Sequence, residues 1–155
     1  MASVIAALYA ALTIVFSPIS FSAVQVRIAE ALNILPMFTS AAIPGLFIGC
    51  LLGNLFSGAL FMDTLFGSLA TLVGAYFGYK FRHERWLVPV PSIIANSLII
   101  PFILRCCYGV ELPIGLLMIY IAAGEFLGSY VLGELFGSFL LKHKAFFRKE
   151  ELLQK

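Results

Sequence analysis

Residues 20–35 read SFSAVQVRIAEALNIL and place two charges, Arg27 and Glu30, in a run that is otherwise apolar enough to enter a lipid bilayer. Three residues apart on a helix, the two side chains would share one face, with Cβ atoms about 5–6 Å apart, and could partly neutralise each other. Either charge buried alone near the bilayer centre would cost roughly 2.5–3.5 kcal/mol on insertion scales. Such residues persist mainly where they face a protein interior or a cavity, so this stretch predicts a polar chamber inside a membrane protein.

The composition of the whole chain is that of an integral membrane protein. Its 155 residues are 61% hydrophobic and 12% charged, and the mean hydropathy is +1.02, which excludes an ordinary soluble domain. Residues 4–26 carry no charge and are long enough to cross about 30 Å of hydrocarbon. No basic segment precedes them, so we expect a retained first helix rather than a cleaved leader. The three cysteines have no paired spacing and are interpreted as packing residues.

Six apolar segments, separated by prolines, glycines and charged loops, predict an all-α fold of six transmembrane helices. The segments span residues 2–16, 24–38, 42–57, 63–79, 91–107 and 113–141. With both termini in the cytoplasm, eight of the ten Lys and Arg residues lie in the loop after the fourth helix or in the tail, as the positive-inside rule favours. We therefore expect one six-helix domain, 1–141, and a charged cytoplasmic tail, 142–155.

Small residues at every fourth position mark two helix faces. Gly45, Gly49 and Gly53 in the third segment allow another helix to approach closely. Ala2, Ala6 and Ala10 form a similar face on the first segment. That alanine face indicates either packing within this chain or a docking surface for another subunit.

The polar residues inside the predicted helices are candidates for one chamber that opens to the outside. In the expected topology Gln25, Arg27 and Glu30 lie in the outer half of the second helix, with Asn96 and Glu125 near the middle of the fifth and sixth. Asp63 begins the fourth helix, where a carboxylate either stabilises the helix start or adds to the binding site. Glu134 is half a turn away from Glu125, which favours pairing with a cytoplasmic-side cation or contact with a partner.

The predicted membrane region holds more carboxylates than cations. Arg27 stands against Glu30, Glu125 and Glu134, so the excess must be met by protons, by Arg105 reaching inward, or by a cationic ligand. The last option indicates a small molecule with a basic amine or a guanidine-like donor edge, which a carboxylate accepts well.

No enzymatic pattern is found in the sequence. His83 and His143 lie in basic segments without ligand spacing, and no glycine-rich loop carries a phosphate-binding lysine. We expect no catalytic residues, no metal site and no cofactor, and nothing in the sequence indicates a nucleic-acid partner.

Several of these stretches, taken together, resemble the QueT family, the queuosine-precursor substrate-binding (S) components of energy-coupling factor (ECF) transporters. The resemblance runs over most of the chain but does not cover the residues from about 142 onward. It rests on residues 18–21 (PISF), 24–32 (VQVRIAEAL), 44–55 (PGLFIGCLLGNL), Asp63 with 66–72 (FGSLATL), Pro91 with Asn96, and Gly124 with Glu125.

The resemblance implies an ECF S-component-like bundle in the bacterial plasma membrane. Such a component captures its substrate from outside and topples in the bilayer when it docks on a shared transmembrane coupling protein, which two cytoplasmic ATPases drive. An Ala-xxx-Ala face on the first helix contacts that coupling protein in S components, which favours the docking role of Ala2, Ala6 and Ala10. The implied substrate is a 7-deazaguanine such as 7-aminomethyl-7-deazaguanine or queuine.

Other functions stay open at this stage. The chain could be an S component for another cationic vitamin such as thiamin, or a self-sufficient small carrier coupled to protons through Glu125 or Glu134. An intramembrane enzyme or an assembly factor is a further alternative, against which the missing catalytic pattern counts.

Overall fold

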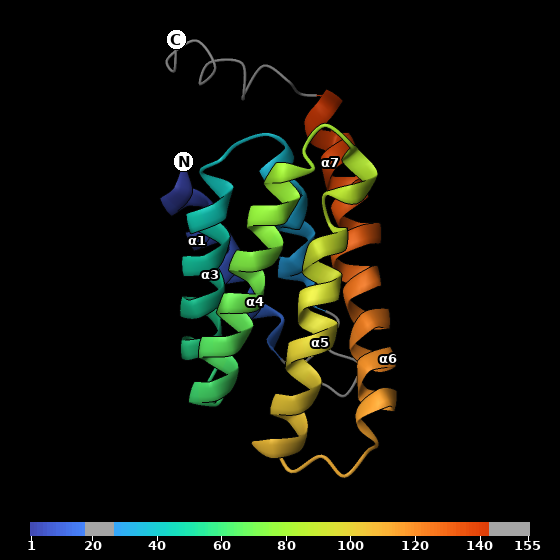
Figure 1. Cartoon of the computed structure of the whole chain (residues 1–155). Helices are drawn as coiled ribbons and strands as arrows, with labels where there is room; N and C mark the ends of the chain where they lie inside the picture. Colours follow the sequence, from blue (N-terminus) through green and yellow to red (C-terminus); the bar gives the residue numbers. More distant parts are fainter. Residues whose placement is uncertain (18–26, 143–155) are drawn as a thin grey trace.

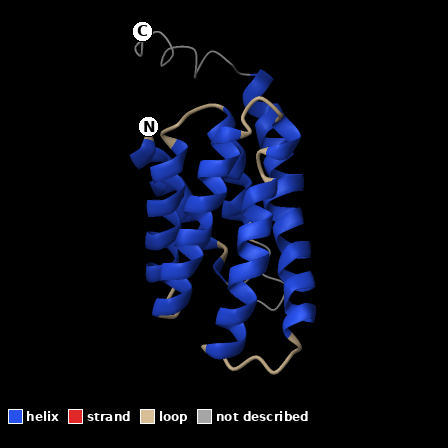
Figure 2. Ribbon diagram, viewed as in Figure 1, coloured by secondary structure: helices blue, strands red, loops and turns tan. Residues whose placement is uncertain are grey.

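The computed structural model describes residues 1–17 and 27–142, and the regular structure in these ranges is entirely helical (Figure 1, Figure 2). Gln25 and the tail from residue 143 onward lie outside the described residues. The described residues form six helical rods, of which the sixth is continuous but built from three segments. The elements are α1 (Ala2–Val15), η1 (Ile28–Met37), α3 (Ala42–Phe56), α4 (Phe61–Lys80), the short turn η2 (Arg85–Leu87), α5 (Val90–Cys106), α6 (Ile114–Glu125), η3 (Phe126–Leu132) and α7 (Gly133–Lys142).

Two helices among the described residues are long and apolar enough to cross a membrane, namely Arg85–Cys106 and Ile114–Lys142. Shorter apolar helices are α1, η1 and α3. The rods run between two ends of the molecule, and residue 1 lies at the same end as Lys142 and the loop that joins α4 to α5 (Figure 1). The loop between α5 and α6 lies at the opposite end. Because the number of described rods is even, residue 1 and Lys142 lie at the same end of the bundle.

The helix η1 occupies the centre of the bundle. It packs against α1, α3, α4, η3 and α7, while α3, α4, α5 and α6 follow one another in sequence order (Figure 1). Seven of its ten residues are buried, including Glu30 and Asn33. The polar side chains of η1 are therefore placed where most of the other helices meet.

Close helix contacts occur where the sequence predicts them. A Cβ atom added at Gly49 would lie 2.7 Å from Cβ of Tyr9 and 2.9 Å from the carbonyl oxygen of Ala6, both on α1. Gly45 and Gly53 meet α1 at 2.9 and 2.8 Å in the same way. Only glycine permits this separation, so the prediction of a tight contact along this stripe is confirmed.

The alanine face of α1 packs inside the chain, which is the first of its two interpretations. Ala6 and Ala10 are buried, Ala2 is half-buried, and Ala6 lies against Gly49 of α3. The exposed small residues of α1 are Ser3, Ala7 and Ala11, one position further along the helix.

The second helix differs from the expectation. We expected an α-helix over residues 24–38, but η1 is a 3-10 helix that begins at Ile28, with Arg27 in extended backbone geometry before it. The argument that Arg27 and Glu30 lie side by side on an α-helix is therefore wrong. In a 3-10 helix residues i and i+3 eclipse each other, so Glu30 aligns with Asn33 instead.

The sixth helix also departs from regular geometry. Residues Phe126–Leu132 form a π-helix between two α-helical segments. A Cβ atom at Gly128 would lie 2.7 Å from the carbonyl oxygen of Arg27, and one at Gly137 would lie 2.9 Å from the Ile34 side chain. The sixth helix therefore packs closely against η1 and the residue before it, at positions both before and after Gly133 in the sequence.

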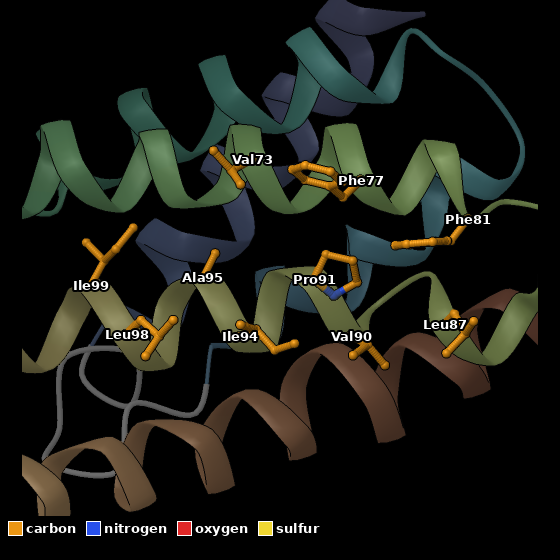
Figure 3. A pocket seen from close by; sticks show the side chains of 10 residues that line it. All are labelled: Val73, Phe77, Phe81, Leu87, Val90, Pro91, Ile94, Ala95, Leu98 and Ile99. Atoms are coloured by element: carbon orange, nitrogen blue, oxygen red, sulfur yellow. The ribbon is translucent and has the colours of Figure 1, made fainter.

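A groove runs along the outer seam between α4 and α5. It has a volume of about 540 Å³, and Figure 3 shows its lining residues, all of them apolar. They include Phe77, Ile94 and Leu98, which are largely exposed. Because it lacks polar groups, this groove suits hydrocarbon rather than a polar ligand.

Candidate binding site

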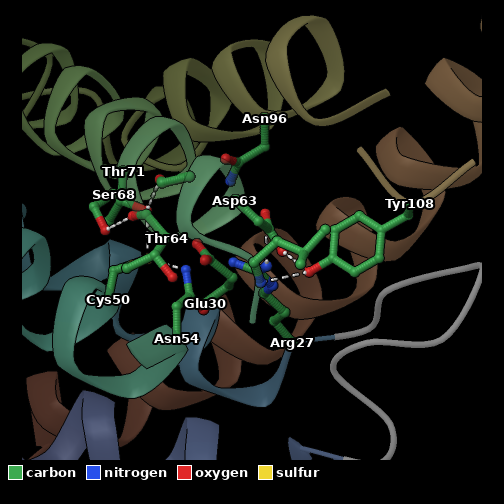
Figure 4. Close-up of polar contacts among 12 residues, drawn as sticks. Arg27, Glu30, Cys50, Asn54, Asp63, Thr64, Ser68, Thr71, Asn96 and Tyr108 are labelled. Atoms are coloured by element: carbon green, nitrogen blue, oxygen red, sulfur yellow. Dashed lines mark hydrogen bonds and ion pairs between the residues drawn. The ribbon is translucent and has the colours of Figure 1, made fainter. Parts of the chain in front are cut away.

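Four buried charged side chains gather around the start of η1. Arg27 is 3% exposed, Glu30 and Asp63 are 0% exposed, and Glu125 is 4% exposed. They come from the residue before η1, from η1 itself, from the first turn of α4 and from the last residue of α6. One cation thus faces three carboxylates in the bundle interior. Figure 4 shows Arg27, Glu30 and Asp63 pointing toward one another.

The carboxylate of Glu30 is held from two sides. The Tyr9 hydroxyl of α1 donates a hydrogen bond to one oxygen, and the Asn33 amide donates to the other. The same Asn33 amide nitrogen lies 2.7 Å from Oγ of Ser92 and 3.0 Å from Oγ of Ser129. The position of Glu30 therefore depends on the spacing of α1, α5 and η3 around η1.

Glu125 is fixed by the neighbouring helices in a similar manner. Asn96 of α5 donates from Nδ2 to Oε1 at 3.0 Å, and Ser129 donates from Oγ to Oε2 at 3.1 Å. Because Asn33 also contacts Ser129, a continuous hydrogen-bond chain links Glu30 to Glu125. The two carboxylates belong to one network.

Asp63 connects this cluster to the end of the molecule that carries the α5–α6 loop. Its Oδ1 lies 3.9 Å from Nη2 of Arg27, and its Oδ2 accepts a hydrogen bond of 3.0 Å from the Tyr108 hydroxyl. The Tyr108 oxygen also accepts the backbone N–H of Leu60 at 3.2 Å. Burial raises the pKa of Tyr108 above its ordinary value, so the hydroxyl stays protonated and can donate to Asp63.

The structure brings together five of the six candidate binding residues, and the sixth, Gln25, lies outside the described residues. Arg27 pairs with Asp63, Asn96 bonds Glu125, and Glu30 joins them through Asn33 and Ser129. The five described residues therefore lie in one cluster.

Two other charged residues are used elsewhere. Glu134 pairs with Arg85 in the loop between α4 and α5, with 2.6 Å between Oε2 of Glu134 and Nε of Arg85. This ion pair is the first of the two interpretations of Glu134, pairing with a cation. Arg105 is exposed and donates to the carbonyl oxygen of Leu112 at 2.8 Å. The option that Arg105 reaches inward to balance the carboxylates is therefore wrong, and Asp63 takes the place of Glu134 in the charge count.

Sequence reasoning missed Tyr9, Asn33, Ser129 and Tyr108. Arg27, Glu30 and Asn33 are spaced three residues apart, which is the period of a 3-10 helix. This spacing would have indicated Asn33 as a neighbour of Glu30. Tyr9 is 21 residues from its partner and Tyr108 is 45 residues from its own. No local pattern reports such contacts.

Chemically, the cluster is an acceptor site. It presents three carboxylates and several amide oxygens around one guanidinium, and carboxylates accept charge-assisted hydrogen bonds from amines and amidine-like edges. Its charged groups are nearly sealed from solvent.

Comparison with known proteins agrees with a transport role. The queuosine precursor transporter QueT of Lactococcus lactis subsp. cremoris (strain MG1363) is 37% identical over 73 residues, which cover 46% of this chain and 43% of the relative. No solved structure matches the chain significantly. The family model described as QueT transporter matches residues 1–142, which include all of the described helices and the polar cluster. The chain therefore belongs to the QueT transporter family, a family of membrane transporters and not of enzymes.

Proposed function

We propose that this protein is the substrate-binding S component of an ECF importer for a queuosine precursor, a 7-deazaguanine such as 7-aminomethyl-7-deazaguanine or queuine. Membership of the QueT transporter family supports transport, and the partial relative is named for a queuosine precursor. The observation that carries the substrate class is the excess of three carboxylates over one cation in the buried cluster around the start of η1, which excludes Glu134 because it pairs with Arg85.

The charge ratio favours a cationic ligand. Each uncompensated buried carboxylate is costly, so the site gains when a positive group enters or when a proton is bound. An aminomethyl deazaguanine supplies both a basic amine and a donor edge. Glu125, already oriented by Asn96 and Ser129, is the acceptor we assign to the amine. Arg27 braces Asp63 rather than binding an anion, because the surplus charge is negative.

The distribution of charge supports capture from the outside. Lys80, Arg82 and Arg85 belong to the end of α4 and the loop that follows it, and Lys142 ends α7. These segments lie at the end that holds residue 1, whereas the α5–α6 loop, which follows Arg105, lies at the opposite end (Figure 1). From the positive-inside rule we infer that residue 1 and Lys142 lie on the cytoplasmic side of a bacterial membrane, and that Tyr108 lies toward the outer side.

In this proposal the energy for transport comes from partner subunits. No phosphate-binding loop is found in the sequence, which fits an S component that docks on a transmembrane coupling protein with two cytoplasmic ATPases. The docking surface we assign is the exposed side of α1 at Ser3, Ala7 and Ala11, since small residues allow close approach of another helix.

A thermal-shift panel on the purified protein tests this function. We expect 7-aminomethyl-7-deazaguanine to raise the melting temperature at low concentration, and riboflavin and biotin to leave it unchanged. A rise in melting temperature with thiamin alone would identify thiamin as the substrate instead. No rise with any deazaguanine would disprove the proposed substrate class.

Uptake into proteoliposomes distinguishes an S component from a proton-coupled carrier. With the coupling protein and ATPases present, uptake should require ATP. Uptake by this chain alone under a pH gradient would instead support the carrier, in which protons balance the same carboxylates.

A further inference from the structure

We propose that the groove between α4 and α5 holds an anionic phospholipid of the cytoplasmic leaflet, with one acyl chain along the groove and the phosphate at Lys80 and Arg82. This lipid is a bound partner and not the transported substrate. The inference rests on the proposed function only for its orientation, with the α4–α5 loop on the cytoplasmic side, and it does not depend on which substrate is carried.

Two rows of large apolar side chains form the walls of the groove, and each row repeats at every fourth position. The rows are Val73, Phe77 and Phe81 on the side of α4, and Val90, Ile94 and Leu98 on the side of α5 (Figure 3). The two backbones nevertheless lie close together, because a Cβ atom at Gly74 would lie 2.7 Å from Ser92. Residues four apart form continuous ridges on a helix, so the space of about 540 Å³ is a channel between two ridges. An extended chain fits such a shape.

The groove has about the length of one leaflet. Val73 and Phe81 are separated by about 12 Å at a rise of about 1.5 Å per residue, and half of the hydrocarbon core is about 15 Å thick. A second apolar cavity, of about 400 Å³, continues along the same two helices toward Cys106 and shares Leu98 and Ile99 with the first. In the proposed orientation the first cavity therefore lies at the depth of the inner leaflet.

The walls favour a lipid chain over a helix of another subunit. Helices associate in membranes mainly through small residues, which let the backbones approach each other. The exposed wall residues are large instead, and Phe77, Ile94 and Leu98 are 39%, 53% and 55% exposed. A helix with its side chains is about 10–12 Å wide, so these ridges would hold it away from the groove. An acyl chain carries no side chains and can lie between them.

Unpaired cations flank the groove where it reaches the α4–α5 loop. Phe81 is a lining residue next to that loop, and it stands between Lys80 and Arg82 in the sequence. Lys80 is exposed, and the guanidinium carbon of Arg82 lies 4.3 Å from the centre of the Tyr79 ring. Neither cation forms an ion pair with a carboxylate in the described ranges. Both are thus available to an anionic group from the bilayer.

The other charges nearby leave this positive charge in excess. Arg85 is neutralised by Glu134, and Glu84 alone stands against Lys80 and Arg82 in this part of the sequence. Guanidinium groups match phosphate geometry well, and basic residues at the membrane surface attract the anionic lipids of the cytoplasmic leaflet. A zwitterionic lipid offers the same chains without net charge, so the headgroup should decide which lipid is bound.

The test compares phosphatidylglycerol and phosphatidylcholine with identical acyl chains on the full chain in detergent, by native mass spectrometry and thermal shift. The parent should bind phosphatidylglycerol about tenfold more tightly or better, with a rise in melting temperature. Glycerol 3-phosphate, which has the charge without the chains, should not bind. Equal binding of the two lipids would overturn the headgroup site, and binding of glycerol 3-phosphate would show a site for free phosphate instead.

Two pairs of variants test the headgroup and the chain separately. Arg82→Gln should weaken phosphatidylglycerol binding about fivefold, and Lys142→Gln, which removes another cation at the same end of the bundle, should not. Ile94→Trp fills the groove and should weaken both lipids, whereas Ile119→Trp, at an exposed position of α6, should weaken neither. If each variant binds lipid as its control does, the groove is not the site. Should Ile94→Trp not fold, the parent and Arg82→Gln still decide.

Other occupants of the groove would give different results. A dimer in detergent that Ile94→Trp dissociates would assign the groove to a second copy of the chain. Loss of ATP-driven uptake in Ile94→Trp with unchanged lipid binding would assign it to the coupling protein. Either result would overturn the lipid site. If the parent binds phosphatidylglycerol as expected but no deazaguanine, the proposed substrate fails and the lipid site stands.

Discussion

The substitution Gly49→Ala links the packing of α1 and α3 directly to the binding site. The added methyl group would lie 2.7 Å from Cβ of Tyr9 and 2.9 to 3.0 Å from backbone atoms of Ala6. Backbone cannot rotate out of the way, so the two helices must separate. Overpacking of this kind costs about 1–3 kcal/mol, and the better helix propensity of alanine offsets about 0.5–1 kcal/mol of it. The expected net loss is about 1–2 kcal/mol of stability.

That loss corresponds to a melting temperature lower by about 2–8 °C for a chain of this size. Thermal unfolding of the purified protein in detergent measures it. The shift of α1 also moves the Tyr9 hydroxyl away from Glu30, and a hydrogen bond to a charged group contributes about 1.5–3 kcal/mol. Ligand affinity should therefore fall roughly tenfold or more.

Gly115→Ala is the matched control, because it makes the same change in a helix where a Cβ atom meets nothing. If Gly49→Ala melts no lower than Gly115→Ala, the close contact of α1 and α3 is not needed for stability. If it melts lower but binds ligand as the parent does, Tyr9 does not position Glu30.

Three further substitutions test other parts of the molecule. Glu125→Gln should weaken binding of 7-aminomethyl-7-deazaguanine roughly tenfold to a hundredfold in a titration, since a charge-assisted hydrogen bond contributes about 1.5–3 kcal/mol. Equal affinity of the variant and the parent would show that Glu125 does not bind the ligand. Ala7→Leu should leave ligand binding intact but stop ATP-driven uptake in proteoliposomes. Val4→Leu, at another exposed position of α1, should leave both binding and uptake intact. Equal uptake by the two variants would disprove docking at Ala7. Glu134→Gln should lose at most about 1 kcal/mol of stability, because its ion pair with Arg85 is partly exposed; a change in ligand affinity would contradict its separation from the site.

Much of the helix layout could be predicted because its signals are local. Prolines near the ends of segments, glycine stripes and charged loops located the third to fifth helices within a few residues, for example Ala42–Phe56 and Val90–Cys106. The cost of burying charge in lipid singled out Arg27, Glu30 and Glu125 without any knowledge of their partners.

The partners themselves could not be predicted, because they depend on backbone geometry and on distant contacts. A period of 3.6 residues was assumed where the chain forms a 3-10 helix, so Asn33 was overlooked beside Glu30. Tyr9 reads as one more apolar residue in α1 until its hydroxyl is seen to reach Glu30. The choice of Asp63, not Glu134, as the third carboxylate also required tertiary contacts, namely those to Arg27 and Arg85.

The π-helical segment Phe126–Leu132 gives the sixth helix one place that can lose a residue with little change in register. Its wide turn holds one residue more than α-helical turns need, so a single-residue deletion there would let the segment close into regular α-helix. Gly133 and Gly137 would then keep nearly the same face toward η1 while Glu125 kept its place. A deletion in the α-helical part of the same helix would instead rotate everything beyond it by about 100°.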